Sequence, residues 1–246
     1  MAYELKADPS LDVPITMTTA ALVVGSELGK RDIAPDHCLW CASNAFDDGA
    51  RDLLKWDSPK TAATISDACG FMLAPATSFA TLAGAAAHDG ASRHTPEDLL
   101  IVVESVAVTA MVNQIVKFGV ARERPYAFHE SSHLDKTTPD AHLSFYSGHT
   151  SITMALAAAG GTVAYQRDYR LAPLVWIPSA AISLFTGYLR IAADKHYLTD
   201  VLTGAVAGSA IGILVPLAFH GRTHETASSS PAPPTAVQAF TIGAAF

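Results

Sequence analysis

Three short stretches of the sequence carry cations and histidines at spacings that suit the binding of a phosphate-like anion. In the first, Lys117 and Arg124 are seven residues apart, with Arg122 between them. Seven residues make two helical turns, so both side chains can face one side of a helix end, which Pro125 is expected to terminate. Two neighbouring cations are costly unless an anion lies between them, and arginine offers a bidentate fork for phosphate oxygens. Interfacial anchoring of Lys117 and Arg124 is the structural alternative.

The second stretch, Ser147-Gly148-His149, precedes a long uncharged run that predicts a helix. Unpaired backbone N–H groups at a helix N-terminus favour an anion, and Gly148 lets the backbone approach that anion closely. The structural alternative is that Ser147 only caps the helix.

The third stretch contains Arg190, His196 and Asp200. His196 and Asp200 are four residues apart, so the carboxylate can accept a proton from one imidazole nitrogen and fix the tautomer. The other nitrogen is then free to attack an electrophile, which is nucleophile activation by an oriented neighbour. A structural hydrogen-bonded pair is the alternative. We favour one shared functional pocket because the three stretches converge at the ends of neighbouring predicted helices.

The composition excludes several classes of protein that could also use such residues. Of 246 residues, 16% are charged and 50% are apolar, and the formal net charge is −7. A disordered chain or a nucleic-acid-binding protein is therefore excluded, because there is too much to bury and too little basic charge. Three cysteines cannot make a disulfide scaffold.

Long uncharged runs predict the helices that must position the three stretches. A helix that crosses a bilayer needs about 20 mostly apolar residues, and no run alternates as a strand would. Small residues suit close helix packing, and Gly204, Gly208 and Gly212 share one helix face. A soluble all-helical bundle is the alternative. The predicted spans are Val13–Ser26, Ala68–Ala87, Leu99–Val116 (interrupted only by Glu104), Leu143–Gln166, Leu171–Leu189 and Val201–His220.

We therefore predict an all-α bundle of six transmembrane helices, with the active site at the helix ends on one face. Because loops alternate sides, the loops at 30–66, 117–142 and 190–200 then share that face. The bundle is expected to cover residues 1–221, and the Pro/Ser-rich segment 222–246 is expected to be a disordered tail. The N-terminus lacks a basic region, so either the first helix is the insertion signal or a leader has been removed.

The three stretches resemble the motifs of the type 2 phosphatidic acid phosphatase (PAP2) superfamily, which also includes bacterial acid phosphatases and vanadium haloperoxidases. The resemblance rests on K-x6-R-P at Lys117 to Pro125, S-G-H at Ser147 to His149, and R-x5-H-x3-D at Arg190 to Asp200. Two positions depart from the family pattern: Tyr146 replaces a proline and Leu189 replaces a serine.

The resemblance implies metal-independent hydrolysis of a lipid phosphate or diphosphate in a bacterial-type cell membrane, with the active site facing the periplasm or the extracellular side. His196 would form a phosphohistidine, Asp200 would orient it, and His149 would act as acid and then base. No cofactor is implied, and vanadate is expected to inhibit. The phosphoryl oxygens would be held by Lys117, Arg124, Arg190, Ser147 and Gly148.

Three alternatives to this implied function stay open. They are a soluble acid phosphatase that acts on small phosphomonoesters, a haloperoxidase that uses vanadate as a cofactor, and a non-enzymatic membrane bundle that only binds anions. The lysine and arginine count also opposes the implied orientation: the active-site face carries 11 and the opposite face 5, and the more positive side usually lies in the cytoplasm.

Weaker signals lie outside the three stretches. His129 to His133 fits H-E-x-x-H, but it lies in a polar loop without a third ligand, so we do not expect a metal. Cys38 and Cys41 could form a local disulfide if their side of the membrane is extracytoplasmic. Cys69 is expected in the core, and Glu104 and Asn113 are expected to face the bundle interior.

Overall fold

The computed structural model describes residues 2–129 and 138–223. Their secondary structure is helical, with no strand in these ranges and only two isolated bridges, Leu5–Arg222 and Trp40–Arg122. This confirms the all-α prediction. The predicted tail lies outside the described residues from position 224 onward.

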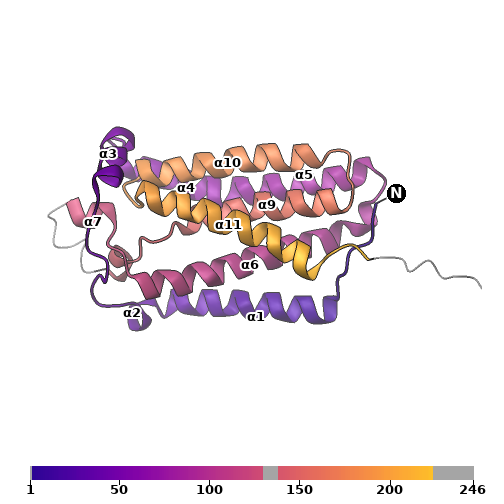
Figure 1. Cartoon of the computed structure of the whole chain (residues 1–246), viewed down its shortest axis with the longest axis horizontal. Coiled ribbons are helices and arrows are strands. Elements are labelled where there is room, and N and C mark those ends of the chain that lie inside the picture. The colour runs from indigo at the N-terminus through magenta and orange to yellow at the C-terminus, as the bar shows by residue number, and fades with distance from the viewer. Residues whose placement is uncertain (1, 130–137, 224–246) are drawn as a thin grey trace, which may run out of the picture.

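The long helices run side by side, with α1 (Pro9–Leu28) at one edge of the bundle and α10 (Ala172–Ala192) at the other (Figure 1). The others are α6 (Thr95–Val120), α9 (Gly148–Gln166), α11 (Leu198–Phe219) and a continuous stretch of α4 (Pro59–Ala68), the π-helical η1 (Cys69–Leu73) and α5 (Ala74–His88).

Short helices gather at the end of the bundle away from the N-terminus, where Figure 1 shows α2, α3 and α7. The region 30–66, predicted as a loop, in fact contains α2 (Lys30–Ile33), α3 (Ala45–Leu54) and the start of α4. In α3, Asn44 caps the first turn and acidic residues follow it, which are local signals for a helix that is too short to cross a membrane. The remaining short elements are η2 (Ser92–His94), α7 (Pro125–His129) and η3 (Pro139–His142).

Helix α9 is the central element, because α5, α6, α10 and α11 all pack against it. Almost every residue from Gly148 to Gln166 is buried or half-buried. The five other long helical stretches, between Pro9 and Phe219, have the length and apolar character to cross a membrane. Since α9 faces protein instead of lipid, it can be built from alanine, glycine and threonine. The predicted six-span bundle therefore corresponds to these five apolar helical stretches and the less apolar α9, with α1 packed mainly on α6.

Glycines of α11 allow its backbone to lie against that of α9, as their spacing predicted. A Cβ atom on Gly208 would come 2.1 Å from the Ser151 carbonyl oxygen, and one on Gly204 would come 2.7 Å from that of Ser147. Neither space admits a side chain. This packing aligns the N-terminal ends of the two helices, which carry His149 and Asp200.

The outer faces of the bundle expose large apolar side chains, as lipid-facing surfaces do. Phe71, Leu184 and Val206 are each more than 60% exposed, and α1 presents most of its apolar surface outward. A soluble bundle would place polar groups at such positions. The chain is therefore a membrane protein.

Candidate active site

A cavity of about 340 Å³ opens at the end of the bundle that carries the short helices. It is lined by six of the eight predicted site residues: Lys117, Arg124, Gly148, His149, Arg190 and His196. The other two, Ser147 and Asp200, are fully buried behind it. Five separate segments meet here, so the three sequence stretches do form one site.

Lys117 and Arg124 reach the cavity by a route that differs from the prediction. Helix α6 ends at Val120, and Ala121 adopts a left-handed conformation with φ of 43°. Arg124 therefore lies beyond the helix, and the two-turn spacing was wrong. Pro125 does not terminate α6 but occupies the first position of α7, where its missing N–H costs nothing.

Backbone carbonyls hold the Arg124 guanidinium in place. Its Nε donates to the Asp140 carbonyl oxygen at 2.7 Å, and Nη1 donates to that of Lys195 at 3.3 Å. The Asp140 carboxylate lies 3.1 Å from Nη2 and 3.5 Å from Lys30 Nζ. Burial raises the pKa of Asp140, but Arg124, Lys30 and Lys117 together outweigh it and hold that pKa below its usual range. Asp140 is thus a counter-ion within the cation cluster.

The start of α9 explains the glycine and serine of the second stretch. A Cβ atom on Gly148 would come 2.8 Å from Asn113 Oδ1 and 3.3 Å from Lys117 Nζ, so only glycine brings the backbone this close to the lysine. Ser147 is the N-cap: its Oγ lies 2.9 Å from Thr150 Oγ1 and accepts from the Thr150 N–H at 3.5 Å. The serine hydroxyl therefore caps helix α9, which is the structural alternative given above.

His196 is oriented by a different partner from the one predicted. Its Nδ1 lies 2.8 Å from the Ser144 carbonyl oxygen but 3.7 Å from Asp200 Oδ2, so the predicted His–Asp hydrogen bond is wrong. Asp200 instead accepts from Arg122 Nη1 and Ser144 Oγ, both at 2.6 Å, and from the Tyr197 N–H at 3.0 Å. Charge-assisted bonds and the capping of α11 saturate this carboxylate.

The Ser144 carbonyl sets the chemistry of His196. A carbonyl oxygen can only accept, so Nδ1 carries the proton and Nε2 keeps its lone pair. Burial, followed by the nearby charges of Arg124 and Arg190, lowers the pKa of His196 well below its ordinary value. The ring is therefore neutral and suited to act as a nucleophile on an anion held by the same cations.

His149 is packed between helices and lies beside a carboxylate that the sequence analysis did not identify. Its Nε2 is 2.9 Å from Asp67 Oδ1, an ion-pair distance at an angle that makes no hydrogen bond. Arg190 Nη1 contacts the same Asp67 oxygen at 3.1 Å and the Ser66 hydroxyl at 3.0 Å. The Phe71 ring packs edge-on against the imidazole, with centroids 4.8 Å apart.

Arg122 has a structural role despite its place beside the first stretch. It is fully buried, with Asp47 Oδ2 at 2.7 Å and Asp200 Oδ1 at 2.6 Å. Its guanidinium also stacks between Trp40 and Tyr197, at 4.0 and 4.2 Å from the ring centroids. Because its two terminal nitrogens bond to these carboxylates, Arg122 ties α3 and α11 together, and it is not among the residues that line the cavity.

The same cavity also has apolar lining residues and reaches α1. Val23, Phe71, Ala110 and Ile152 line it, contributed by α1, η1, α6 and α9. At its rim, Gln114 Nε2 donates to Glu27 Oε1 at 2.6 Å. One cavity is therefore lined both by the cations and histidines and by apolar side chains of several helices.

Comparison with known proteins agrees with these motifs. Residues 98–224, just over half of the chain, match the PAP2 superfamily. The chain belongs to the PAP2 superfamily. This match covers all eight predicted site residues, although it does not reach α1, α4 or η1.

Individual PAP2 relatives match over shorter lengths. Phospholipid phosphatase 1 of Rattus norvegicus is 34% identical over 83 residues, which are 32% of this chain and 29% of the relative. Phospholipid phosphatase 2 of Homo sapiens is 32% identical over 80 residues, covering 30% of this chain and 28% of the relative. The chain thus matches less than a third of either relative.

A transmembrane PAP2-type phosphatidylglycerolphosphate phosphatase from Bacillus subtilis has a similar solved structure. Its TM-score is 0.48 at 18% identity, over 83% of this chain and 93% of that one.

The two departures from the PAP2 pattern lie in buried supporting positions. Tyr146 is 3% exposed, and its carbonyl oxygen accepts from Asn113 Nδ2 at 2.9 Å. Leu189 is fully buried in a small apolar cluster with Ala62, Cys69 and Ala192. Neither side chain is among the residues that line the cavity.

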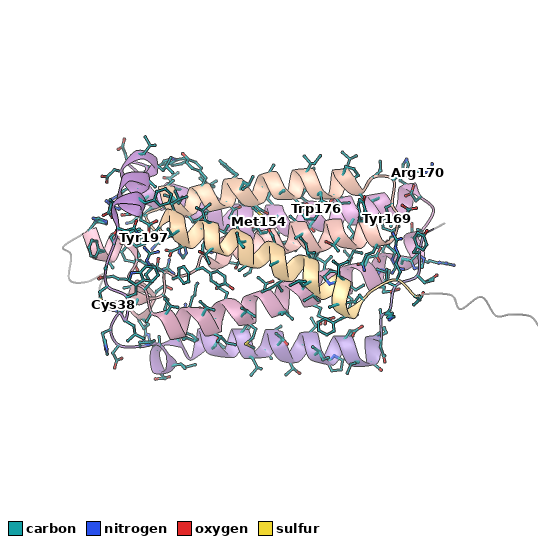
Figure 2. The ribbon with its side chains drawn as sticks, in the orientation of Figure 1. Cys38, Met154, Tyr169, Arg170, Trp176 and Tyr197 are labelled. Carbon is teal, nitrogen blue, oxygen red and sulfur yellow. A yellow bond between two sulfur atoms is a disulfide. The ribbon has the colours of Figure 1, made fainter. Side chains whose placement is uncertain are left out.

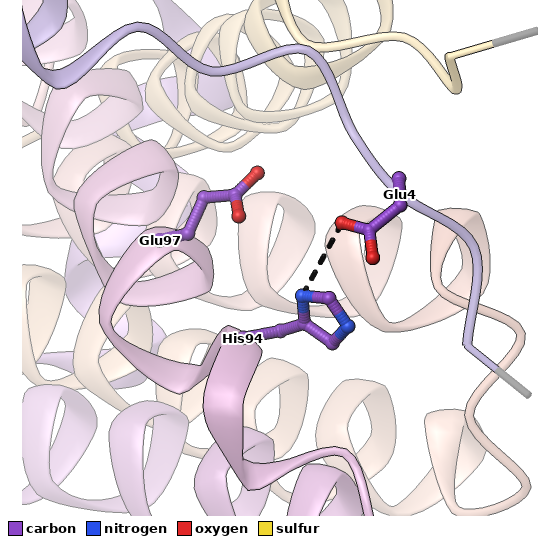
Figure 3. Close-up of side chains that lie close together, drawn as sticks. All are labelled: Glu4, His94 and Glu97. Atoms are coloured by element: carbon purple, nitrogen blue, oxygen red, sulfur yellow. Dashed lines mark ion pairs between the residues drawn. The ribbon is translucent and has the colours of Figure 1, made fainter.

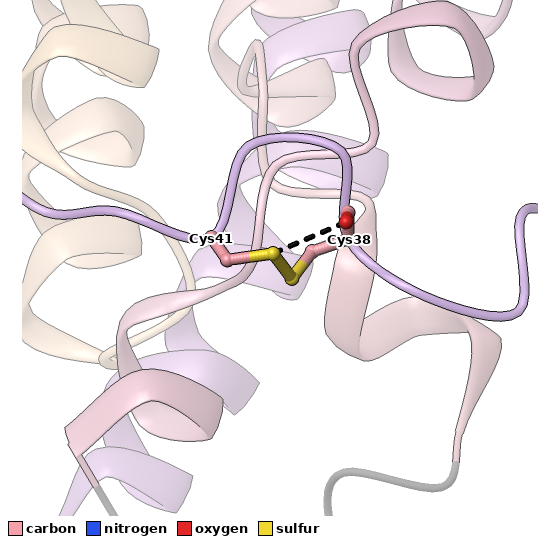
Figure 4. The surroundings of a disulfide bond; sticks show 2 residues. All are labelled: Cys38 and Cys41. Carbon is pink, nitrogen blue, oxygen red and sulfur yellow. Dashed lines mark hydrogen bonds between the residues drawn. A yellow bond between two sulfur atoms is a disulfide. The ribbon is translucent and has the colours of Figure 1, made fainter.

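The residues that gave weaker signals in the sequence lie near this PAP2 site or in the core. His129 ends α7 with Nε2 3.2 Å from Asp48, while the rest of H-E-x-x-H, at 130–133, lies outside the described residues. Cys38 and Cys41 form a disulfide with Cα atoms 5.4 Å apart, and Cys41 Sγ is 3.1 Å from the Cys38 carbonyl oxygen (Figure 4). Cys69, Glu104 and Asn113 are buried, as predicted.

Proposed function

We propose that this PAP2 chain hydrolyses the phosphate or diphosphate of a membrane lipid through a phosphohistidine on His196, without a metal ion. The observation that carries the proposal is the single cavity that is lined both by the cations and histidines and by apolar side chains. A lipid phosphate has the same two parts: an anionic headgroup and a hydrocarbon tail. The phospholipid phosphatases that match this chain support the same substrate class.

In the proposed first step, His196 Nε2 forms a bond to phosphorus while the bond from phosphorus to the ester oxygen breaks. Protonated His149 gives its proton to the leaving oxygen, and Asp67 is placed to stabilise that imidazolium. In the second step, His149 takes a proton from water, the water oxygen bonds to phosphorus, and the phosphorus–nitrogen bond breaks. Free phosphate and neutral His196 result.

The cations supply what a phosphoryl-transfer site needs most. Negative charge develops on the equatorial oxygens of the transferred group, and preorganised positive groups stabilise it. Lys117, Arg124 and Arg190 line the cavity. In this scheme they take the part that a divalent ion takes in other phosphoryl-transfer enzymes.

The decisive experiment measures phosphate release from a phosphatidate, a prenyl diphosphate and a soluble aryl phosphate, in detergent with EDTA. We expect release by the wild type, and a loss of at least about 10⁴-fold in the His196→Ala variant. His129→Ala is the matched control, because His129 lies at the same end but outside the cavity lining. Rapid acid-free quenching with a labelled aryl phosphate, whose leaving group departs without a proton from His149, should trap a phosphoenzyme in the His149→Ala variant.

Other outcomes would select a different function. A preference for the aryl phosphate without detergent would favour the soluble acid-phosphatase activity. Peroxide-dependent halide oxidation that requires vanadate would favour a haloperoxidase, whereas in the proposed reaction vanadate inhibits. Anion binding without turnover would leave an anion-binding bundle. Release that EDTA abolishes in protein that stays folded would contradict metal independence.

We further propose that the active site faces the extracytoplasmic side of a bacterial-type membrane. The Cys38–Cys41 disulfide supports this, since disulfides persist in oxidising compartments and this one lies at the active-site end. Figure 2 places Cys38 and Tyr197 at that end, and Tyr169 and Arg170 at the other.

Thiol labelling of intact cells tests this orientation. After mild reduction, a membrane-impermeant maleimide should label Cys38 and Cys41. It should not label an Arg170→Cys variant that lacks those two cysteines, because Arg170 lies exposed at the opposite end. Labelling of Arg170→Cys alone would place the active site in the cytoplasm, as the lysine and arginine count suggests.

A further inference from the structure

A second cluster of ligating side chains lies at the other end of the bundle, remote from the cavity of the proposed active site. Asp12 of α1, Glu104 of α6 and His220 at the end of α11 each offer one ligand atom, and these atoms all lie within 4.8 Å of one another. All three residues are less than 9% exposed. They line a separate cavity of about 570 Å³.

The hydrogen bonds of His220 leave one ring nitrogen directed at the carboxylates. Its Nδ1 lies 2.9 Å from the Lys6 carbonyl oxygen, so Nδ1 carries a proton and donates it there. Its Nε2 lies 3.2 Å from Glu104 Oε2 and donates to that carboxylate when protonated; a metal ion would displace this proton and take the Nε2 lone pair. A histidine that donates its second nitrogen to a backbone carbonyl has the usual arrangement of a metal ligand.

The charge of this cluster is only partly balanced by protein. Within residues 2–129 and 138–223, neither Asp12 nor Glu104 forms an ion pair with a lysine or arginine. The Asp12 carboxylate accepts from the Asp8 N–H at 2.8 Å. Of the other charged residues that line the cavity, Lys6 and Asp8 cancel each other. A protonated His220 can compensate only one of these two buried carboxylates, so the cluster keeps a negative charge that a bound cation would balance.

In a second acidic cluster, arginines compensate the negative charge of the carboxylates. Glu4, His94 and Glu97 also approach one another, as Figure 3 shows. Here Arg93 lies 2.9 Å from Glu4 and donates to His94 Nε2 at 3.1 Å, and Arg167 lies 3.0 Å from Glu97. Arginines already occupy the place that a cation would take, so this cluster serves as a control.

We propose that Asp12, Glu104 and His220 bind a divalent transition-metal ion that fastens α1 to α6 and α11. One imidazole and two carboxylates suit zinc or a neighbouring first-row ion better than calcium or magnesium, which prefer oxygen ligands alone. Around a tetrahedral zinc ion with bonds of about 2.1 Å, ligand atoms lie about 3.4 Å apart, so small side-chain shifts would close the site. The negative end of the α11 dipole also favours a cation beside His220.

Such an ion would matter most for α1, which is the least buried of the five apolar helical stretches, with only 11% of its apolar stretch buried. Among the described elements, α1 packs mainly on α6, yet it supplies Val23 and Glu27 to the cavity at the other end. An ion at Asp12 would hold the remote end of this helix. The proposed role is structural, and it does not depend on the reaction proposed above.

The experiment measures zinc binding and thermal stability of the full chain in detergent, purified without a histidine tag and stripped with chelator. We expect one Zn²⁺ per chain by elemental analysis, and a rise in Tm of about 3 °C or more on addition of Zn²⁺. Glu104→Gln and His220→Gln should each weaken binding at least about 100-fold. His94→Gln, in the compensated cluster, should bind as the wild type does.

Three outcomes would overturn the proposal: no saturable binding of Zn²⁺ or Mn²⁺ at 1:1, binding that survives Glu104→Gln and His220→Gln, or binding that His94→Gln removes. Because stoichiometry and Tm do not involve phosphate release, a failure here would leave the phosphatase proposal standing. The reverse also holds.

Discussion

Arg190, in the last turn of α10, and Arg167, at the C-terminal end of α9, lie near opposite ends of the bundle. Both are almost completely buried, yet their charges are compensated very differently. Arg167 contacts the buried Asp98 carboxylate at 2.7 Å and donates to the Tyr3 carbonyl oxygen at 2.8 Å. Arg190 has the Ser66 hydroxyl and the half-exposed Asp67 carboxylate, and it shares a cavity with two other cations. Both arginines are buried, but only Arg190, in the candidate active site, has a charge that nearby carboxylates compensate incompletely.

The largest predicted effect comes from exchanging these two arginines for glutamine. Arg190→Gln should lower kcat/KM by about 10³-fold, because one preorganised donor to the phosphoryl oxygens is lost. Its Tm should stay level or rise, because the variant relieves repulsion among the cations. Arg167→Gln should leave the kcat of folded protein unchanged. It should lower the free energy of unfolding by about 3–5 kcal/mol, since the Asp98 carboxylate would remain buried without its arginine.

Phosphate release per folded molecule and thermal unfolding of the same preparations check this pair. If Arg190→Gln lost stability and Arg167→Gln lost activity, compensation would not separate the two roles, and the comparison between the ends would fail.

Arg122 sharpens the comparison because it is a compensated arginine at the active-site end. Arg122→Met should lower the free energy of unfolding by about 3–5 kcal/mol, because Asp47 and Asp200 would remain buried without a cation beside them. Unlike Arg167→Gln, it should also reduce kcat. Asp200 accepts from the Ser144 hydroxyl, and the Ser144 carbonyl oxygen orients His196, so a shift of Asp200 would disturb the histidine. The double variant Arg122→Met, Asp47→Asn should recover part of the stability. Wild-type Tm in Arg122→Met would contradict this account.

The sequence predicted the site better than it predicted the path of the chain that builds it. Motif spacing identified the residues that converge, since ligand chemistry fixes residue types and order. It misplaced Arg124 on a helix, because the left-handed turn at Ala121 carries no glycine to mark it. It paired His196 with Asp200 because a spacing of four allows contact. It could not show that Arg122 and Ser144, distant in sequence, saturate that carboxylate.

Asp67 shows the limit most clearly. It is a single acidic residue in α4, 82 positions before His149, and no local pattern distinguishes it from a solvated carboxylate. Only packing of η1 against α9 brings it within 2.9 Å of His149. Glu27 and Val23 were missed for the same reason, because α1 has no motif that links it to the cavity.

Asp67→Asn should give a smaller effect, of about tenfold in kcat, with KM nearly unchanged. The asparagine keeps a contact with Arg190 but no longer stabilises protonated His149, so the basic limb of the pH–rate profile should move to lower pH. Asp52→Asn, an exposed carboxylate on α3, is the matched control. If kcat fell without a shift of the pH limb, Asp67 would act only through packing.

The smallest predicted effect uses the histidines at the two ends, whose pKa values move in opposite directions. Burial lowers the pKa of His220, but its hydrogen bonds with Glu104 and the Lys6 carbonyl oxygen, together with the nearby carboxylate charges, outweigh burial and raise that pKa. Burial and the nearby cations instead lower the pKa of His196. Native His196 therefore stays neutral while the unfolded chain protonates near pH 6.5. The stability from this difference is present above pH 6.5 and is lost as pH falls, by at most about 1.4 kcal/mol per pH unit.

His196→Asn isolates this contribution, because the asparagine amide can still donate to the Ser144 carbonyl oxygen but does not titrate. Between pH 7.5 and 5, the Tm of the wild type should fall by a few degrees more than that of the variant. Since His220 is unchanged in both proteins, its opposite dependence cancels in the difference. Equal slopes would mean that His196 is protonated in the native protein, and a protonated imidazole could not serve as the nucleophile.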